Sequence, residues 1–386
     1  MENFVFDVGT KIYFGKGQLE NLGQEILKYT DRVLLCHNNG SIKKNGIYDA
    51  VVAELKRNGI YFKELTKIDP NPRIESVGEG VKICREHNLK GVLAVGGGSI
   101  IDCAKAISAG VNLEFDDPWD IMKVYPKEYE LLPVFSVLTL AATGSEMNDI
   151  SVITNEKLKK KGSTGSQRPV CSILDPTFTY SVPQYQTMAG IIDIMSHTLE
   201  VYFSKGDGHY LLDGFAMSIL KTCVKYGPIL MKDPCNYEAR ANIMWAASYA
   251  INGVISHGKP HTWTWHPISH PITAYYGLAH GATFSILMPN WMEYVLNEDN
   301  AKYFVRFGVE VFEVDKNLSD LEIAKETIKR FKAFIKSLNQ PLTFSEAGVD
   351  DRYFNEIVEN MTIGGNERRL IPITNQDVMN IYRKCL

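Results

Sequence analysis

Short apolar runs alternate with stretches of helical spacing in the first part of the chain. Ile47, Val51 and Leu55 recur every four residues among polar positions, which is typical of an amphipathic helix. Because strands that alternate with helices build βαβ units, the pattern predicts a parallel sheet covered by helices. The expected strands are 32–36, 61–65 and 91–95, and the expected helices are 43–57 and 76–87.

The second half of the chain has a different pattern. Helical spacing extends over residues 185–249 and returns at 321–337, and few runs there resemble strands. Two prolines close to residue 180 mark the change. The sequence therefore predicts an α/β domain over residues 1–180 and an all-helical domain over residues 181–386.

The composition narrows the class of protein. Lys and Arg total 41 and Asp and Glu total 45 in 386 residues, a balance that argues against a nucleic-acid or polybasic membrane binder. The apolar run 131–142 is too short to span a bilayer, and the first seven residues include no basic residue, unlike a secretory signal. Seven scattered cysteines without a CxxC pair indicate reduced thiols, so we expect a cytoplasmic protein.

Three consecutive glycines, Gly96, Gly97 and Gly98, follow the third expected strand and precede a helical segment. Glycine lets the backbone approach a ligand closely, and the N–H groups at the start of a helix attract phosphate. Ser99 can donate to a phosphate oxygen. The alternative is a tight turn in which Ser99 caps the helix with Asp102 three residues later. We favour phosphate binding because three glycines cost much conformational entropy.

A second turn of small residues, 138–146, follows the apolar run that begins at residue 131. Its hydroxyl groups, including that of Thr139, can line a phosphate or ribose pocket. Alternatively, Thr143 or Ser145 caps a helix. The residues alone leave both interpretations open.

Histidines are concentrated in one segment, since five of the nine lie between His257 and His280. His266 and His270 are four residues apart, on one face if helical, and His280 follows ten residues later. The prolines and glycines among them argue against one continuous helix. The other histidines, expected on the surface or in loops, are His37, His87, His209, His257 and His261.

Asp193 and His197 form a second pair four residues apart, within an apolar helical segment. Burying a carboxylate beside an imidazole is costly unless the two are hydrogen-bonded or bind a metal. With two more histidines they would supply three nitrogens and one oxygen, which suits a divalent first-row metal. The alternative is an Asp–His hydrogen bond between helices, with the other histidines separate in the core. Two spaced pairs together with His280 favour the metal site.

Taken together, these motifs resemble those of the iron-containing (group III) alcohol dehydrogenases, in the branch of butanol dehydrogenases and broad-range aldehyde reductases. GGGSxxDxxK matches residues 96–105, TGSE matches 143–146, DxxxH matches 193–197 and HxxxHxxxxxxxxxH matches 266–280. The order and spacing are kept over nearly the whole chain. The resemblance implies a Rossmann-like dinucleotide-binding domain, an all-helical metal-binding domain and a homodimer.

The resemblance also implies roles for individual residues of the helical domain. Asp193, His197, His266 and His280 would bind one Fe²⁺ or Zn²⁺. His270 would lie near the metal without necessarily binding it, as a residue that relays protons.

In the α/β domain, the resemblance implies a dinucleotide lying across the glycine turn. Ser99 and Thr139 would lie near phosphate or ribose, and Asp102 near the nicotinamide-side ribose. Lys161 resembles a family lysine close to the cofactor. The alternative for Lys161 is a solvated basic hairpin at residues 159–162.

The loop after the first expected strand bears on the choice of dinucleotide. An acidic residue in such a loop usually holds the ribose 2′-hydroxyl of NAD, yet residues 33–48 contain no carboxylate. Asn39, Gly40 and Ser41 can donate hydrogen bonds to a 2′-phosphate, and Lys43 or Lys44 adds positive charge. We therefore expect NADP(H), with NAD(H) as the alternative.

The expected reaction is metal-assisted hydride transfer between NADP(H) and a small aliphatic alcohol or aldehyde, such as butanol or butanal. Trp263 and Trp265 flank the histidines and either line an apolar pocket or belong to the core. Three rival classes are a glycerol dehydrogenase-like polyol oxidoreductase, a dehydroquinate synthase-like lyase and a non-catalytic protein that binds metal or senses NADP. The lyase acts on a charged substrate and would need a basic cleft.

Overall fold

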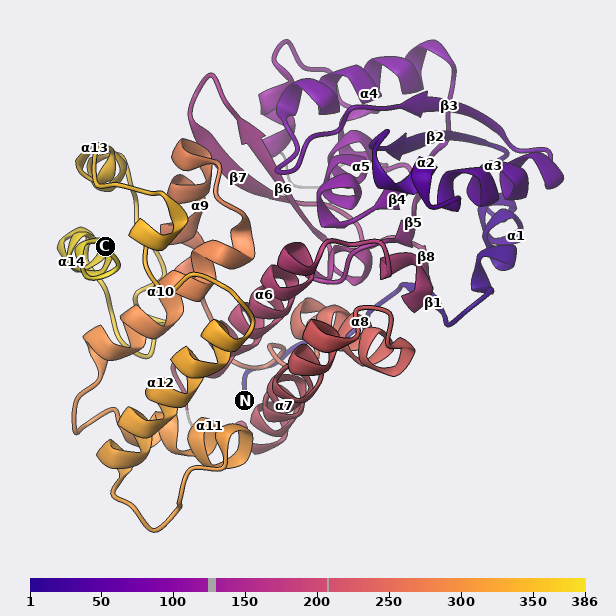
Figure 1. Cartoon of the computed structure of the whole chain (residues 1–386). Coiled ribbons are helices and arrows are strands. Elements are labelled where there is room, and N and C mark those ends of the chain that lie inside the picture. Colours follow the sequence, from indigo (N-terminus) through magenta and orange to yellow (C-terminus); the bar gives the residue numbers. More distant parts are fainter. Residues whose placement is uncertain (124–129, 207) are drawn as a thin grey trace. The chain divides into compact units, whose positions relative to one another are not determined.

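The computed structural model describes residues 1–123, 130–206 and 208–386, which form two compact units (Figure 1). The α/β unit comprises residues 7–182. The helical unit comprises residues 183–386 together with residues 1–6. All described strands belong to the α/β unit. The described part of the helical unit contains helices and no strand. This confirms the predicted fold class.

A six-stranded parallel sheet forms the centre of the α/β unit. Its strand order is β1-β8-β5-β4-β2-β3, and every neighbouring pair is parallel. The three strands expected from the sequence are all present. The six strands are β1 (Lys11–Phe14), β2 (Arg32–His37), β3 (Tyr61–Leu65), β4 (Gly91–Gly96), β5 (Val134–Leu138) and β8 (Cys171–Leu174).

Helices cover both faces of this sheet. The chain runs from β2 outward to β3 and then back past β2 to β4, so right-handed crossovers place α3 and α4 on opposite faces. The single helix expected at 43–57 is instead two helices, because the chain turns at Gly46 with a φ of 79°. The helices are α1 (Leu22–Leu27), α2 (Ser41–Lys44), α3 (Ile47–Arg57), α4 (Ile74–Glu86) and α5 (Gly98–Gly110).

An antiparallel hairpin of β6 (Ile150–Asn155) and β7 (Lys160–Gly165) packs against α5, outside the main sheet. Short 3₁₀ turns connect the larger elements of the chain. They lie at Gln18–Asn21, Pro118–Lys123, Ser145–Met147, Pro176–Thr179 and Ser345–Ala347.

The helical unit is built around α6, which is buried from Thr187 to Val201 and contacts α7, α8 and α10. Among the described residues, no helix combines the length and the apolar character needed to cross a membrane. The helices are α6 (Gln184–Tyr202), α7 (Tyr210–Lys232), α8 (Tyr237–Ile251), α9 (Trp265–Tyr276), α10 (His280–Val295), α11 (Lys302–Phe312), α12 (Asp320–Ser337), α13 (Phe354–Glu359) and α14 (Asn375–Lys384).

Candidate active site

The segments that follow β2, β4 and β5 lie at one edge of the parallel sheet, because these strands are neighbours and run in the same direction. This edge gathers the loop with Asn39, Gly40 and Ser41, the glycine turn and Thr139. The N–H of Thr139 donates to the carbonyl of Gly96 at 3.0 Å, which joins the last two segments. The carboxyl edge is where open α/β sheets bind ligands.

Helix α5 begins at Gly98, directly after β4, and no side chain caps it. Ser99 lies inside the first turn, so the alternative in which Ser99 caps the helix is wrong. None of the three glycines has a positive φ. A β-carbon on Gly98 would lie 2.1 Å from Oγ1 of Thr143, so packing against the second turn requires glycine at this position. The uncapped start of α5 suits a phosphate.

Two further residues of the glycine motif, Asp102 and Lys105, join α5 to the second turn. Asp102 accepts hydrogen bonds from the hydroxyl of Ser145 and from the N–H of Val152. Lys105 is fully buried, and its Nζ donates to Ser145 at 2.9 Å and to Asn148 at 3.0 Å. Burial lowers the pKa of Lys105 to about 8, although Asp102 acts in the opposite direction. The contact of Asp102 with a ribose stays a prediction.

Lys161 lies on β7, in the basic hairpin that the sequence offered as an alternative. Its Nζ donates to Oδ1 of Asn71 at 2.9 Å, and the N–H of Asn71 donates to Oγ of Ser99 at 3.4 Å. Lys161 is only partly exposed. It is therefore connected through Asn71 to the first turn of α5, where we predict the dinucleotide.

Sequence reasoning missed a carboxylate near the predicted cofactor loop. Glu64 on β3 places Oε2 at 3.1 Å from Nε2 of His37, the last residue of β2. Its Oε1 accepts a hydrogen bond from the Tyr48 hydroxyl at 2.6 Å. Burial raises the pKa of Glu64, but these hydrogen bonds outweigh burial and lower it below its ordinary value. An ionised carboxylate therefore lies beside the end of β2, just before the predicted cofactor loop. Glu64 is distant from this loop in the sequence, so only the pairing of β2 with β3 could have indicated its position.

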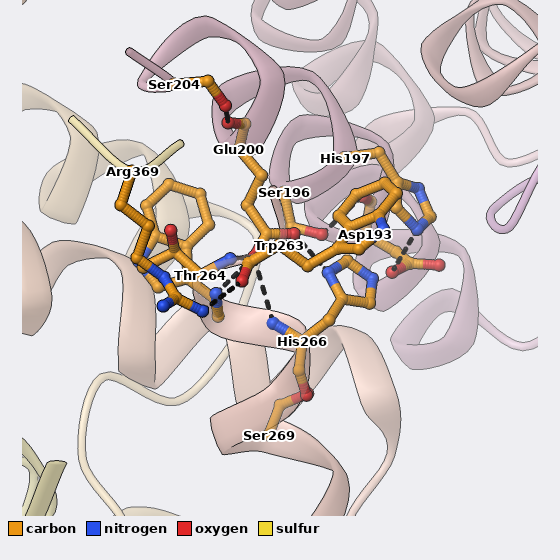
Figure 2. A network of polar contacts seen from close by, with 11 residues as sticks. Asp193, Ser196, His197, Glu200, Ser204, Trp263, Thr264, His266, Ser269 and Arg369 are labelled. Atoms are coloured by element: carbon orange, nitrogen blue, oxygen red, sulfur yellow. Dashed lines mark hydrogen bonds and ion pairs between the residues drawn. The ribbon is translucent and has the colours of Figure 1, made fainter. Parts of the chain in front are cut away.

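Asp193 and His197 lie one turn apart on the buried helix α6, as the apolar sequence around them indicated (Figure 2). Nε2 of His197 lies 3.8 Å from Oδ1 of Asp193. Burial, and the neighbouring His266, hold the pKa of His197 well below its ordinary value. The imidazole is therefore neutral, which is the form that binds metals.

His266 and His280 come from two successive helices, as the prolines and glycines between them indicated. Helix α9 ends at Gly277, whose φ is 70°, and α10 begins at His280. The start of α10 packs tightly on α6, because a β-carbon on Gly281 would lie 1.9 Å from the carbonyl oxygen of Ala189. This close packing brings His280 to the helix that carries Asp193.

The result is a histidine cluster, formed by Asp193, His197, His266, His270 and His280. One ligand atom each of Asp193, His266 and His280 lies within 4.8 Å of the other two. The ring of His197 stacks on that of His266 with centroids 4.9 Å apart, and the rings of His270 and His280 are 5.5 Å apart. A carboxylate together with imidazole nitrogens is a donor set that fits Fe²⁺ or Zn²⁺.

Aromatic side chains flank the histidine cluster. The ring of Trp263 lies 4.8 Å from that of His266, and the ring of Phe284 lies 4.4 Å from that of His280. Phe284 has no special signal in the sequence, because it lies one turn after His280 in an apolar helix. Trp265 is fully buried, so of the two alternatives for this residue the structure supports the core.

The expectation that five further histidines lie on the surface or in loops is wrong for one of them, since His37 has no exposed surface and is the last residue of strand β2. His209 lies in the loop before α7, as expected, although it is only 4% exposed. His87, His257 and His261 are partly exposed. For His37, the apolar run directly before it was a signal of burial.

Comparison with known proteins identifies the family. Residues 9–176 match the family model described as iron-containing alcohol dehydrogenase, and residues 187–386 match the C-terminal model of the same family. NADH-dependent butanol dehydrogenase A of Clostridium acetobutylicum is 48% identical, with 100% of both chains covered. The NADPH-dependent aldehyde reductase YqhD of Escherichia coli is 38% identical over 91% of this chain and 90% of its own.

A solved structure agrees with this result. NADH-dependent butanol dehydrogenase A from Thermotoga maritima has a TM-score of 0.93 and 37% identity, covering 100% of this chain and 99% of that chain. The fold and site define an oxidoreductase with a dinucleotide-binding unit and a helical metal-binding unit. The chain belongs to the iron-containing alcohol dehydrogenase family. Members of this family use NAD(P)(H) and a divalent metal, which are the cofactors that the resemblance of the motifs implied.

Proposed function

We propose that this chain interconverts short aliphatic alcohols and aldehydes, such as butanol and butanal, at one divalent metal bound by Asp193, His197, His266 and His280. The observation that carries the proposal is the approach of three ligand atoms within 4.8 Å, beside the neutral ring of His197. The names of the relatives, butanol dehydrogenase and aldehyde reductase, support the substrate class. Iron and zinc both suit this donor set.

When bound, the metal acts as a Lewis acid on the carbonyl or alkoxide oxygen, while the dinucleotide gives or takes the hydride. The residues of the chain bind and orient these groups. Trp263, which is partly exposed, gives an alkyl chain an apolar surface. The buried ring of Phe284 packs beside His280 and limits the access of water. His270, which is partly exposed and beside His280, passes a proton between the substrate oxygen and solvent through its imidazole.

For the dinucleotide, the proposed contacts are at the carboxyl edge of the sheet. The exposed loop supports NADP(H), since its amide and hydroxyl groups can bind a 2′-phosphate. NAD(H) is a second candidate, supported by the ionised Glu64 and by the names of two relatives. The proposed contact residues are Asn39, Gly40, Ser41, Gly96, Gly97, Gly98, Ser99, Asp102, Thr139 and Lys161.

We also propose that the enzyme is a cytoplasmic homodimer. All seven cysteines are free thiols and six of them are buried, which fits a reducing compartment. Strand β1 lies at an edge of the sheet and pairs with β8 on one side, so its other side can pair with a second copy. Sedimentation of the purified protein tests the assembly.

The proposed reaction is tested with chelator-treated protein, butanal, and NADPH or NADH in parallel. We expect turnover to return when Fe²⁺ or Zn²⁺ is added under anaerobic conditions. Turnover that needs no metal would contradict the ligand set. Faster reaction with NADH than with NADPH would contradict only the cofactor preference.

The rival functions give different outcomes in the same assay. A polyol oxidoreductase would prefer glycerol to butanol. A lyase or a sensor would bind the dinucleotide without turnover of any aldehyde. The aromatic surroundings of the histidine cluster support the alkyl substrate over a charged one.

A further inference from the structure

Glu200 is a buried carboxylate on the same helix as Asp193 and His197. Its side chain has no exposed surface. The three residues are spaced by four and three positions on α6, so they lie along one face of the helix. Figure 2 shows the carboxylate of Glu200 reaching toward His266.

The two oxygens of Glu200 have different partners. Oε1 accepts hydrogen bonds from the backbone N–H groups of Thr264, Trp265 and His266, at 2.7 Å from Thr264 and 3.0 Å from His266. Oε2 accepts a hydrogen bond from Nδ1 of the His266 ring. One oxygen therefore caps the start of α9, and the other contacts a predicted metal ligand.

The groups around Glu200 explain how its carboxylate is accommodated in a buried position. The first N–H groups of α9 have no cap from the side chain of Thr264, so Glu200 replaces the usual capping residue. Arg369, which is 2% exposed, donates from its guanidinium to the carbonyl of Trp263 at 2.9 Å and is attracted to the charge of Glu200. A role limited to capping α9 would require only Oε1. It does not explain the contact of Oε2 with the imidazole of His266.

We infer that Glu200 is a positioning residue for His266, an inference that rests on the proposed metal site. Oε2 holds the proton of His266 on Nδ1 and fixes the ring, so that Nε2 carries a lone pair toward the metal. Oε1 fixes the backbone that carries this ring. Carboxylates that orient metal-binding histidines in this way typically change metal affinity about 10- to 100-fold when they are replaced.

The variant Glu200→Gln separates the two roles. A glutamine keeps an oxygen for the backbone N–H groups, but it presents an NH₂ group to Nδ1, which favours the tautomer with the proton on Nε2. We expect the Co²⁺ affinity of the metal-free protein to fall about 10- to 100-fold, with an altered visible spectrum of bound Co²⁺. The far-UV circular dichroism and melting temperature of the metal-free protein should change little.

Ser319→Ala is the matched control, because it removes a cap from α12, away from the cluster. It should lower the melting temperature without changing Co²⁺ affinity. Unchanged Co²⁺ affinity and spectrum in Glu200→Gln would overturn the positioning role and leave Glu200 as a cap. If His266→Ala also binds Co²⁺ like the wild type, the metal site itself is wrong.

A measurement on the unmodified chain covers the case in which Glu200→Gln fails to fold. Nitrogen-15 NMR of histidine-labelled, metal-free protein reports which ring nitrogen of His266 carries the proton, with His266→Ala to assign the signal. We expect protonation at Nδ1. Protonation at Nε2 alone would overturn the inference.

Discussion

The imidazole rings of His197 and His266 stack with centroids 4.9 Å apart and planes inclined by 19°. They come from α6 and α9, two helices that are separate in the sequence. Stacked in a buried place, the two rings cannot both be protonated without a large electrostatic cost. The stacking places the ring of His197 beside a residue whose ligand atom lies within 4.8 Å of those of Asp193 and His280.

Removal of a proposed ligand should strongly weaken metal binding. We expect His266→Ala and His280→Ala to lose about 100-fold or more in metal affinity, because each supplies a ligand atom within 4.8 Å of Asp193. The measurement is metal content after dialysis, with butanal turnover in parallel. His261→Ala, which is outside the donor group, serves as the control. Full metal content and rate in His280→Ala would show that the ligand set is wrong.

His270 should behave differently from the ligands. We expect His270→Ala to keep its metal and to lose about 100-fold in kcat, because it relays protons without supplying a ligand. The decisive measurements are metal content and the pH profile of kcat. Loss of the metal from this variant would make His270 a ligand and remove its role as a relay.

Gly98→Ala tests why the glycine turn contains glycine. Its β-carbon would lie 2.1 Å from Oγ1 of Thr143, so we expect a loss of about 1–3 kcal/mol in the free energy of unfolding. The double variant with Thr143→Ala should recover part of this loss, as urea denaturation would show, because the Cβ of residue 143 would still lie 2.9 Å from the new β-carbon. If dinucleotide affinity stays low in the double variant, the glycine also serves the ligand. Wild-type stability of Gly98→Ala alone would refute the packing explanation.

Glu64 should affect the choice between the two dinucleotides. Its ionised carboxylate lies beside His37, just before the predicted 2′-phosphate loop. We expect Glu64→Gln to raise the ratio of kcat/KM for NADPH to that for NADH by about fivefold, since removing a nearby charge is worth about 1 kcal/mol in water. Tyr48→Phe removes a hydrogen bond but keeps the charge, so it should change the ratio less. An unchanged ratio in Glu64→Gln would exclude this effect.

The lowered pKa of Glu25 should make the free energy of unfolding depend on pH. Burial raises the pKa of Glu25, but hydrogen bonds from Lys11, Lys28 and Tyr13 outweigh burial and lower it to about 2. Because the folded pKa is depressed, the stabilisation is complete above pH 4.5 and is lost as the pH falls toward 2. Glu25→Gln should therefore cost about 1–3 kcal/mol near neutral pH and progressively less in acid. A difference that does not vary with pH would contradict this account.

Much of the architecture could be predicted because it depends on local patterns. The strands at 61–65 and 91–95 and the helices α6 and α12 follow from apolar spacing within one element. The exceptions have local causes that spacing does not reveal. Gly46 takes a left-handed conformation and divides the expected helix at 43–57, and β6 and β7 lack a strong apolar alternation.

The sequence by itself determined the candidate chemistry of this protein. Regular spacing places Asp193 with His197, and His266 with His270, on one helix face each, and the glycine run marks the start of a helix after a strand. These are relations between neighbours along the chain, so helix and strand geometry alone predicts them.

Only the tertiary structure decided which distant groups meet. Packing of α10 on α6 brings His280 to Asp193, and the contact between α6 and α9 directs Glu200 to the ring of His266. The pairing of β2 with β3 brings the charge of Glu64 to His37. Such contacts depend on the register and closeness of packed elements, which no periodicity along one element specifies.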